Sequence, residues 1–139
     1  MAVLWRAALD AIRAEAERRD IAICAAIVDA GAHLVALERM DGAVLASAET
    51  SQVKARTSAL FGAPTRVFPY DKPVAPALLG GVGFPVGLFP GGIPVWHDGA
   101  LLLAIGVGGS TGEHDDACAS AGAKAVEAAL TGAAADAMT

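Results

Sequence analysis

The sequence predicts an α/β (α+β) fold in which helices flank a central, mostly antiparallel sheet of five strands. Apolar residues recur at helical spacing near the start, the middle and the end of the chain, and strand-length apolar segments lie between these helices. Short turns join neighbouring strands at two places, which is typical of antiparallel hairpins and not of parallel strands joined by helices. The chain of 139 residues suits one domain with its own core, so we expect a single domain over 1–139.

The first predicted elements are a helix and a hairpin. A surface helix over about 2–19 is indicated by apolar residues at helical spacing: Leu4, Trp5, Ala8, Leu9, Ile12 and Ala16. The almost continuous apolar run 21–28 predicts a strand that is covered on both faces. Turn residues at 29–33 then lead into a returning strand over 34–39.

A second helix is predicted over 47–61, where Ser47 can cap its start. Its residues fall on stripes of different character. The polar stripe holds Ser47, Ser51, Lys54 and Ser58, the stripe expected to face the core holds Ala46, Val53, Thr57 and Leu60, and a face of small residues holds Ala48, Ala55 and Ala59. Two apolar faces need two packing partners, so we expect the polar stripe to line a recess.

The second half of the chain is predicted to add three strands and a helix. Residues 64–82 are expected to be irregular or to hold a short helix near 74–79. Three short apolar segments predict strands at about 84–89, 93–97 and 100–107.

The last helix is expected over about 113–130, followed by a frayed tail over 131–139. Ser110 and Glu113 have the spacing of a capping box at its start. The preceding loop lacks the lysine of a nucleotide P-loop, and acidic residues at the start of the helix would repel an anion. We therefore interpret the loop as a helix start and not as a phosphate site.

Composition and charge exclude several classes of function. The net charge of −5, with no basic run longer than Arg18-Arg19, argues against nucleic-acid binding. The uncharged stretch 74–95 contains prolines and glycines that would break a membrane-spanning helix, so no membrane partner is expected. Two cysteines without metal or redox spacing, and a charged N-terminus unlike a signal peptide, favour a cytoplasmic protein. The alanine-rich apolar composition favours an oligomer, because surplus apolar surface is often buried between subunits.

Candidate ligand-binding residues lie in the second helix, at the end of the first hairpin and just before the strand at 93–97. Lys54 could bind a ligand carboxylate or, if desolvated, serve as an acid or base; the alternative is a lysine that extends into solvent. Arg39 offers a planar fork suited to a carboxylate and Met40 an adaptable apolar contact, the alternative being a surface ion pair of the arginine. Gly91 and Gly92 indicate either a strand bulge or a place where a ligand lies against the backbone.

His97 lies beside Trp96 at the end of a predicted strand. A histidine in this position is a candidate axial ligand of haem iron or a general acid or base; the alternative is an exposed turn residue. No two histidines share metal-ligand spacing, so we do not expect a metal site built from protein side chains alone.

Two separated motifs resemble the hallmarks of the GlcG/HbpS family, which is also found as the C-terminal part of PduO-type proteins. The first motif spans 27–43 and includes Asp41-Gly42. The second spans 91–116 and includes Gly91-Gly92 and Asp115-Asp116, while Lys54 matches a lysine that is typical of the family. The similarity extends from Leu4 to about Leu130.

The resemblance implies a profilin-like α/β/α layering and a homo-oligomer, from a dimer up to an octamer. Some members of the family bind haem, and others are encoded alongside glycolate, diol or aromatic catabolism. It therefore implies a small-molecule-binding domain with haem or another tetrapyrrole as the leading ligand. In that case Arg39 and Lys54 would meet carboxylates and His97 would be the axial iron ligand.

Two alternatives stay open beside haem binding. One is an enzyme of small organic-acid or aromatic catabolism in which Lys54 is the acid or base and Glu113 or His97 is the second proton-transfer group. The other is a structural or accessory subunit of a larger assembly. The chain departs from the family pattern at Trp96-His97 and over 67–80, where a pocket could lie.

Overall fold

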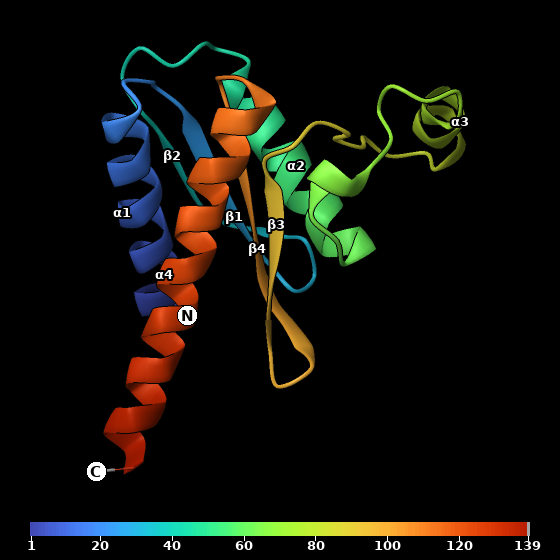
Figure 1. Cartoon of the computed structure of the whole chain (residues 1–139). Coiled ribbons are helices and arrows are strands. Elements are labelled where there is room, and N and C mark those ends of the chain that lie inside the picture. Colours follow the sequence, from blue (N-terminus) through green and yellow to red (C-terminus); the bar gives the residue numbers. More distant parts are fainter. Residues whose placement is uncertain (139) are drawn as a thin grey trace.

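The computed structural model describes the backbone of residues 1–138 and the side chains of residues 1–132 (Figure 1). Its elements follow in the order α1 (Ala2–Arg18), β1 (Cys24–Asp29), β2 (Leu34–Arg39), α2 (Ser47–Phe61), a short 3₁₀ helix (Thr65–Val67), α3 (Val74–Gly81), β3 (Gly92–His97), β4 (Ala100–Gly108) and α4 (Gly112–Met138). None of the helices in this described part is both long and apolar enough to cross a membrane.

The sheet is antiparallel, as predicted, but it has four strands in the order β2-β1-β4-β3. The predicted fifth strand at 84–89 is wrong. Val86 and Leu88 pack with Ala75 in a small cluster of their own, and the N–H of Gly87 donates to Oγ1 of Thr57 at 2.8 Å instead of to a neighbouring strand. The apolar side chains of this segment therefore pack against α3, and its backbone is hydrogen-bonded to α2.

Helices cover both faces of the sheet (Figure 1). Helices α1 and α4 pack against each other on one face, where the largest core cluster lies, and α2 lies on the other face over β1, β4 and β3. The core cluster contains apolar side chains from α1, from α4 and from one face of the strands: Ala8, Leu9, Ile12, Ala16, Ile23, Ala25, Ile27, Val95, Leu103, Ile105, Val107, Cys118, Ala119, Ala123 and Val126. The apolar stripe predicted on the first helix therefore packs into this core cluster, and Leu4 and Trp5 are its partly buried members.

Helix α2 packs unusually close to the sheet. A Cβ atom on Gly106 of β4 would collide with the backbone oxygen of Ser51 and would lie 2.5 Å from the backbone nitrogen of Ala55. The hydroxyls of Ser47 and Ser51 donate to carbonyls of their own helix region, those of Val44 at 2.6 Å and Ala48 at 3.2 Å. Small side chains with internally satisfied hydroxyls therefore bring the helix backbone against the strand.

This packing corrects the predicted orientation of α2. The stripe expected to face the core does not do so as a whole, because Leu60 is 51% exposed and Val53 is only partly buried. The polar stripe is the buried one: Ser47, Ser51, Lys54 and Ser58. A serine fits a close helix–sheet contact better than a large apolar residue, because it is small and its hydroxyl can donate to a carbonyl of its own helix.

The helix ends also differ from the predicted caps. Ser47 is the first residue of α2 and not its cap, since Ala46 holds that position. At the start of α4, Oγ1 of Thr111 accepts from the N–H of His114 at 3.2 Å, so Thr111 replaces the predicted box of Ser110 and Glu113. Helix α4 continues to Met138 instead of ending near 130, and Thr139 of the predicted tail lies outside the described residues.

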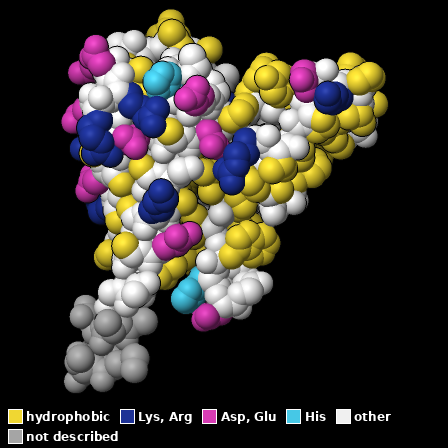
Figure 2. Space-filling model, viewed as in Figure 1, with side chains coloured by type: hydrophobic (Ala, Val, Ile, Leu, Met, Phe, Trp, Pro, Cys, Tyr) yellow, Lys and Arg dark blue, Asp and Glu magenta, His cyan; other side chains and the backbone are white. Residues whose placement is uncertain are grey.

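The segment between α2 and β3 forms an arm that carries α3 away from the body (Figure 1). Thr65 anchors its base, because its Oγ1 donates to the carbonyl of Phe89 and accepts from the N–H of Gly92, both at 2.8 Å. Figure 2 shows hydrophobic side chains gathered over this arm, whereas charged side chains cover the body formed by α1 and α4. The predicted short helix near 74–79 is the α3 of this arm.

Candidate functional site

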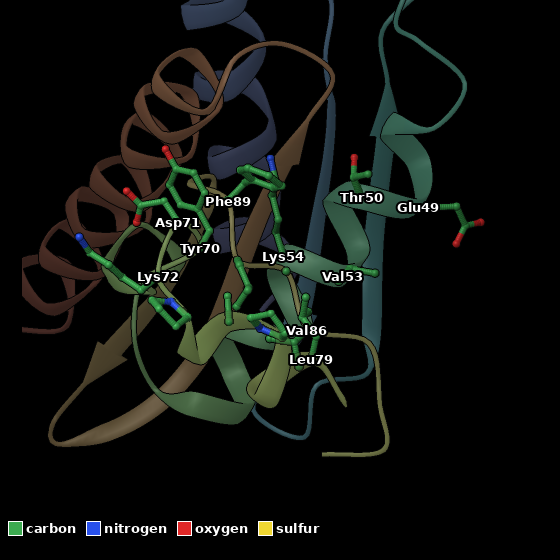
Figure 3. Close-up of a pocket in the computed structure, with 15 residues that line it drawn as sticks. Glu49, Thr50, Val53, Lys54, Tyr70, Asp71, Lys72, Leu79, Val86 and Phe89 are labelled. Atoms are coloured by element: carbon green, nitrogen blue, oxygen red, sulfur yellow. The ribbon is translucent and has the colours of Figure 1, made fainter. Parts of the chain in front are cut away.

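A pocket of about 680 Å³ lies between α2 and the arm (Figure 3). We call it the outer pocket. It is lined by residues from the outward side of α2, from the start of the arm and from the segment that returns to β3: Glu49, Thr50, Val53, Lys54, Tyr70, Asp71, Lys72, Pro73, Ala75, Pro76, Leu79, Val86, Gly87, Leu88 and Phe89.

The walls of the outer pocket are predominantly apolar. Aliphatic side chains such as Val53, Val86 and Leu79 face the space in Figure 3, and the rings of Tyr70 and Phe89 lie 5.0 Å apart at one side. Charged groups belong to the rim, where Glu49, Asp71 and Lys72 are exposed. This arrangement suits a ligand with an apolar body and polar edges.

A second, smaller cavity of about 320 Å³ lies beside the start of α4. We call it the inner cavity. It is lined by Val44, Ala46, Ser47, Thr50, Lys54, Phe89, Gly109, Ser110, Gly112 and Asp115. Its lining contains hydroxyl, ammonium and carboxylate groups, and it shares Thr50, Lys54 and Phe89 with the outer pocket.

Lys54 is buried between the two cavities. The residue is only 7% exposed, and its Nζ donates to the carbonyl of Val107 and to Oδ2 of Asp115, both at 3.0 Å. The alternative in which this lysine extends into solvent is therefore excluded. Glycines surround its side chain: a Cβ on Gly91 would lie 3.0 Å from Nζ, and one on Gly87 would lie 3.3 Å from Cγ.

Asp115 is the functional residue that sequence reasoning missed. It is 2% exposed, and its Oδ1 accepts from the N–H of Ser110 at 3.1 Å while its Oδ2 accepts from Lys54. Burial raises the pKa of this carboxyl above its usual value, although Lys54 and the Ser110 N–H act in the opposite direction. The one signal for this residue in the sequence was its place in the second motif, within Asp115-Asp116. Its pairing with Lys54 was not predicted, because an acid in the first turn of a helix is already explained by the helix dipole.

Two of the other predicted site residues join Lys54. Gly91 and Gly92 are buried next to it: a Cβ on Gly92 would lie 2.5 Å from the Lys54 carbonyl oxygen. Both glycines therefore allow the backbone to approach the helix around the lysine, and neither lines the outer pocket or the inner cavity. The ladder with β4 is regular at Gly92, and the irregularity of β3 lies between Val95 and Trp96, so the predicted bulge is not at the glycines.

The remaining predicted residues lie elsewhere. Arg39 is exposed at the end of the edge strand β2, and Met40 packs against the core cluster on the α1 and α4 side. His97 is exposed at the tip of the β3–β4 hairpin with its Nε2 at 3.3 Å from Oδ2 of Asp98, and Glu113 is exposed on α4. None of these four lines either cavity.

His97 and Lys54 lie toward opposite ends of the same hairpin. In the ladder between β3 and β4, His97 pairs with Ala100, whereas Gly92 beside Lys54 pairs with Gly106. A ligand in the outer pocket of one chain is therefore out of reach of the same chain's His97. Among the described residues there is also no cluster of three side chains that could hold a metal ion.

The sequence is similar to one family of known proteins. Residues 3–124 match the family model described as "Haem degrading protein HbpS-like". Protein GlcG of Escherichia coli (strain K12) is 37% identical over 94 residues, which cover 67% of this chain and 69% of the relative.

Solved structures share the fold over most of the chain. The Klebsiella pneumoniae protein ORFY superposes with a TM-score of 0.86 at 24% identity and covers 92% of this chain and 90% of its own; it supports the fold alone. A PduOC:heme complex has a TM-score of 0.82 at 25% identity over 90% of this chain and 93% of its own. A double mutant of HbpS from Streptomyces reticuli has a TM-score of 0.79 at 30% identity over 89% of this chain and 84% of its own.

Proposed function

Since the chain belongs to the HbpS-like family, we propose that it binds a flat, largely apolar small molecule in the outer pocket, with haem or another tetrapyrrole as the leading candidate. The observation that carries this proposal is the apolar space of about 680 Å³ between α2 and the arm. Its size lies within the range of small-molecule sites, and apolar walls with few polar groups are typical of them. The structural similarity to a PduOC:heme complex supports the choice of ligand.

The lining of the outer pocket fits the ring of a porphyrin better than it fits the iron. Aliphatic and aromatic side chains can contact a flat conjugated ring, and Lys72 at the rim can meet a carboxylate. None of the described lining residues is a histidine, methionine or cysteine, and the one tyrosine, Tyr70, whose oxygen is of a kind that can bind haem iron, packs its ring beside that of Phe89. Haem would bring redox-active iron to the pocket when bound, but this chain's own contribution there is to bind and orient the ring.

We therefore expect the metal-free ring to bind nearly as well as haem. Fluorescence or absorption titration with protoporphyrin IX and with haem is expected to give saturable binding, with dissociation constants within about fivefold, because little affinity comes from an iron–protein bond. The variant Val53→Glu, which places a charge in the apolar wall, is expected to weaken both by about tenfold or more.

Two variants serve as controls for this titration. Val3→Glu changes an exposed side chain of α1 outside the pocket lining and outside the arm, and His97→Ala removes the distant histidine; both are expected to bind like the unmodified chain. The proposal fails if neither porphyrin binds saturably. A dissociation constant that rises in His97→Ala as much as in Val53→Glu would place the ligand elsewhere.

We further propose that the chain works as a homo-oligomer in which the arm contacts a second copy. Several large apolar side chains of the arm are exposed, and Val67 and Val74, which do not line the outer pocket, are 59% and 54% exposed. Apolar surface gathered on one projecting element is typical of a protein contact surface. Packing of another copy against the arm would also cover the open side of the outer pocket.

A further inference from the structure

We propose that the inner cavity is a polar subsite of the same ligand site, which accepts an uncharged hydrogen-bonding group, a hydroxyl or a carbonyl, from a ligand whose apolar ring lies in the outer pocket. This inference rests on the proposed function of the outer pocket. It adds the chemical class of the ligand's polar group and the residues that would recognise it, Thr50, Lys54 and Asp115.

The two cavities meet at shared residues. Thr50, Lys54 and Phe89 line both of them. The Phe89 residue is 59% exposed, and Figure 3 shows the Lys54 side chain extending toward its ring. These three residues form the shared wall of the outer pocket and the inner cavity, and two of them, Thr50 and Phe89, are exposed. The proposed ligand extends from the first into the second past the ring of Phe89.

The lining of the inner cavity offers both donors and acceptors. Lys54 has three N–H groups, and within the described part of the chain two of them are used, by Val107 and Asp115. The hydroxyl of Thr50 has only a long contact of 3.5 Å to the carbonyl of Ser47, so it is free to turn toward a better partner. Each carboxylate oxygen of Asp115 accepts one hydrogen bond and can accept a second.

The charge balance of the cavity favours an uncharged group. Lys54 and Asp115 neutralise each other at 3.0 Å, so an additional buried ion would have no counterion. An anion would also meet the acidic first turns of α4, where Glu113 and Asp116 flank Asp115 in the sequence. A hydroxyl or carbonyl group avoids this cost and still satisfies the polar lining.

Three naphthalene probes test this inference: naphthalene, β-naphthol and β-naphthoate. They share one flat apolar ring system and differ in the polar group. In fluorescence titrations, we expect β-naphthol to bind about tenfold tighter than naphthalene, as one well-placed hydrogen bond allows. In Lys72→Met, which removes the rim lysine that can meet a carboxylate, we expect β-naphthoate to bind no tighter than naphthalene.

The variant Thr50→Val links the effect to the cavity, because it removes the hydroxyl with little change of shape. It is expected to reduce the advantage of β-naphthol over naphthalene, both measured in the same variant, to less than about threefold. The matched control Thr131→Val changes a threonine of α4 that bonds to Glu127 of its own helix and lines neither cavity, and it is expected to behave like the unmodified chain.

The outcomes separate this inference from the proposed function. The inference is overturned if β-naphthol binds no tighter than naphthalene, if β-naphthoate binds tightest in Lys72→Met, or if Thr50→Val and Thr131→Val act alike. The inference is also overturned if none of the three probes binds to a chain that still binds porphyrin, because the subsite would then contribute no affinity. Loss of porphyrin binding itself is the separate failure of the outer pocket.

Discussion

At the scale of single residues, the centre of the molecule is the buried pair of Lys54 and Asp115. Each charge is removed from water, which costs several kcal/mol, and each is compensated by the other and by a backbone group, the Val107 carbonyl or the Ser110 N–H. The pair also ties α2 to the end of β4 and to the start of α4. Such a pair stabilises the fold only while both charges are present, because either charge alone would be buried without a counterion.

Removing one partner is therefore expected to destabilise the fold strongly. Asp115→Asn keeps the shape but leaves the Lys54 charge without its counterion, so we expect the free energy of unfolding to fall by about 3 kcal/mol in urea denaturation. The double variant Lys54→Met with Asp115→Leu removes both charges and is expected to recover at least half of that loss.

The control for this series is Asp10→Asn, which breaks an exposed ion pair with Arg13 at 3.4 Å. Exposed pairs contribute little because water screens them, so no measurable change is expected. A loss of stability in Asp115→Asn no larger than in Asp10→Asn would show that the buried charge is solvated or neutralised in another way.

At the scale of elements, the contact between α2 and β4 decides where the site lies. Glycines on β4 and small residues on α2 bring the two backbones together, and this places Lys54 against the end of the strand. On the opposite side of the same helix, Val53 lines the outer pocket. One helix thus provides a close structural contact on one side and a ligand wall on the other.

A methyl group at this contact should be costly. Gly106→Ala puts a Cβ onto the backbone of Ser51, and overpacking of this kind is expected to reduce the free energy of unfolding by about 3 kcal/mol. The matched variant Gly80→Ala lies in α3, where a Cβ would meet nothing within 4 Å, and it is expected to cause no loss. Equal stabilities of the two variants in thermal or urea unfolding would contradict the close contact.

At the scale of the whole molecule, the arm gives the chain its open and largely apolar side (Figure 2). It leaves the four-stranded sheet after α2 and returns before β3, held at its base by Thr65. The arm forms one wall of the outer pocket and exposes the other side of α3. Ligand binding and association with a second copy are therefore proposed for adjoining surfaces.

The assembly proposal predicts a change of mass on altering the arm. Val74 is 54% exposed and lines neither cavity, so Val74→Glu is expected to shift the native mass from an oligomer toward the monomer, because a charge cannot be buried at an apolar contact without a partner. Native mass spectrometry measures this directly. Ala30→Glu, at the exposed hairpin turn between β1 and β2, is the control. A monomeric unmodified chain, or an unchanged mass in Val74→Glu, contradicts the proposal.

The sequence by itself determined the local elements of this protein. Apolar patterns predicted α1, α2 and β2 to within one residue at each end, and β1 with a start three residues too early, because these patterns report the type of an element. They did not predict which face of α2 is buried. The sequence also identified Lys54 as the residue of α2 to examine. The two motifs also predicted the family, and the match to the family model and the GlcG relative confirm that prediction.

Only the tertiary structure decided what each face packs against. The short apolar segment at 84–89 predicted a strand, but its packing partners are helices, and a local sequence pattern cannot show this. Lys54 and Asp115 are far apart in the sequence, and each has a sufficient local explanation, so their pairing depends on how α2 and α4 meet at the end of β4. His97 was separated from Lys54 by the length of a strand for the same reason: local patterns define elements, whereas distances between them are set by packing across the sheet.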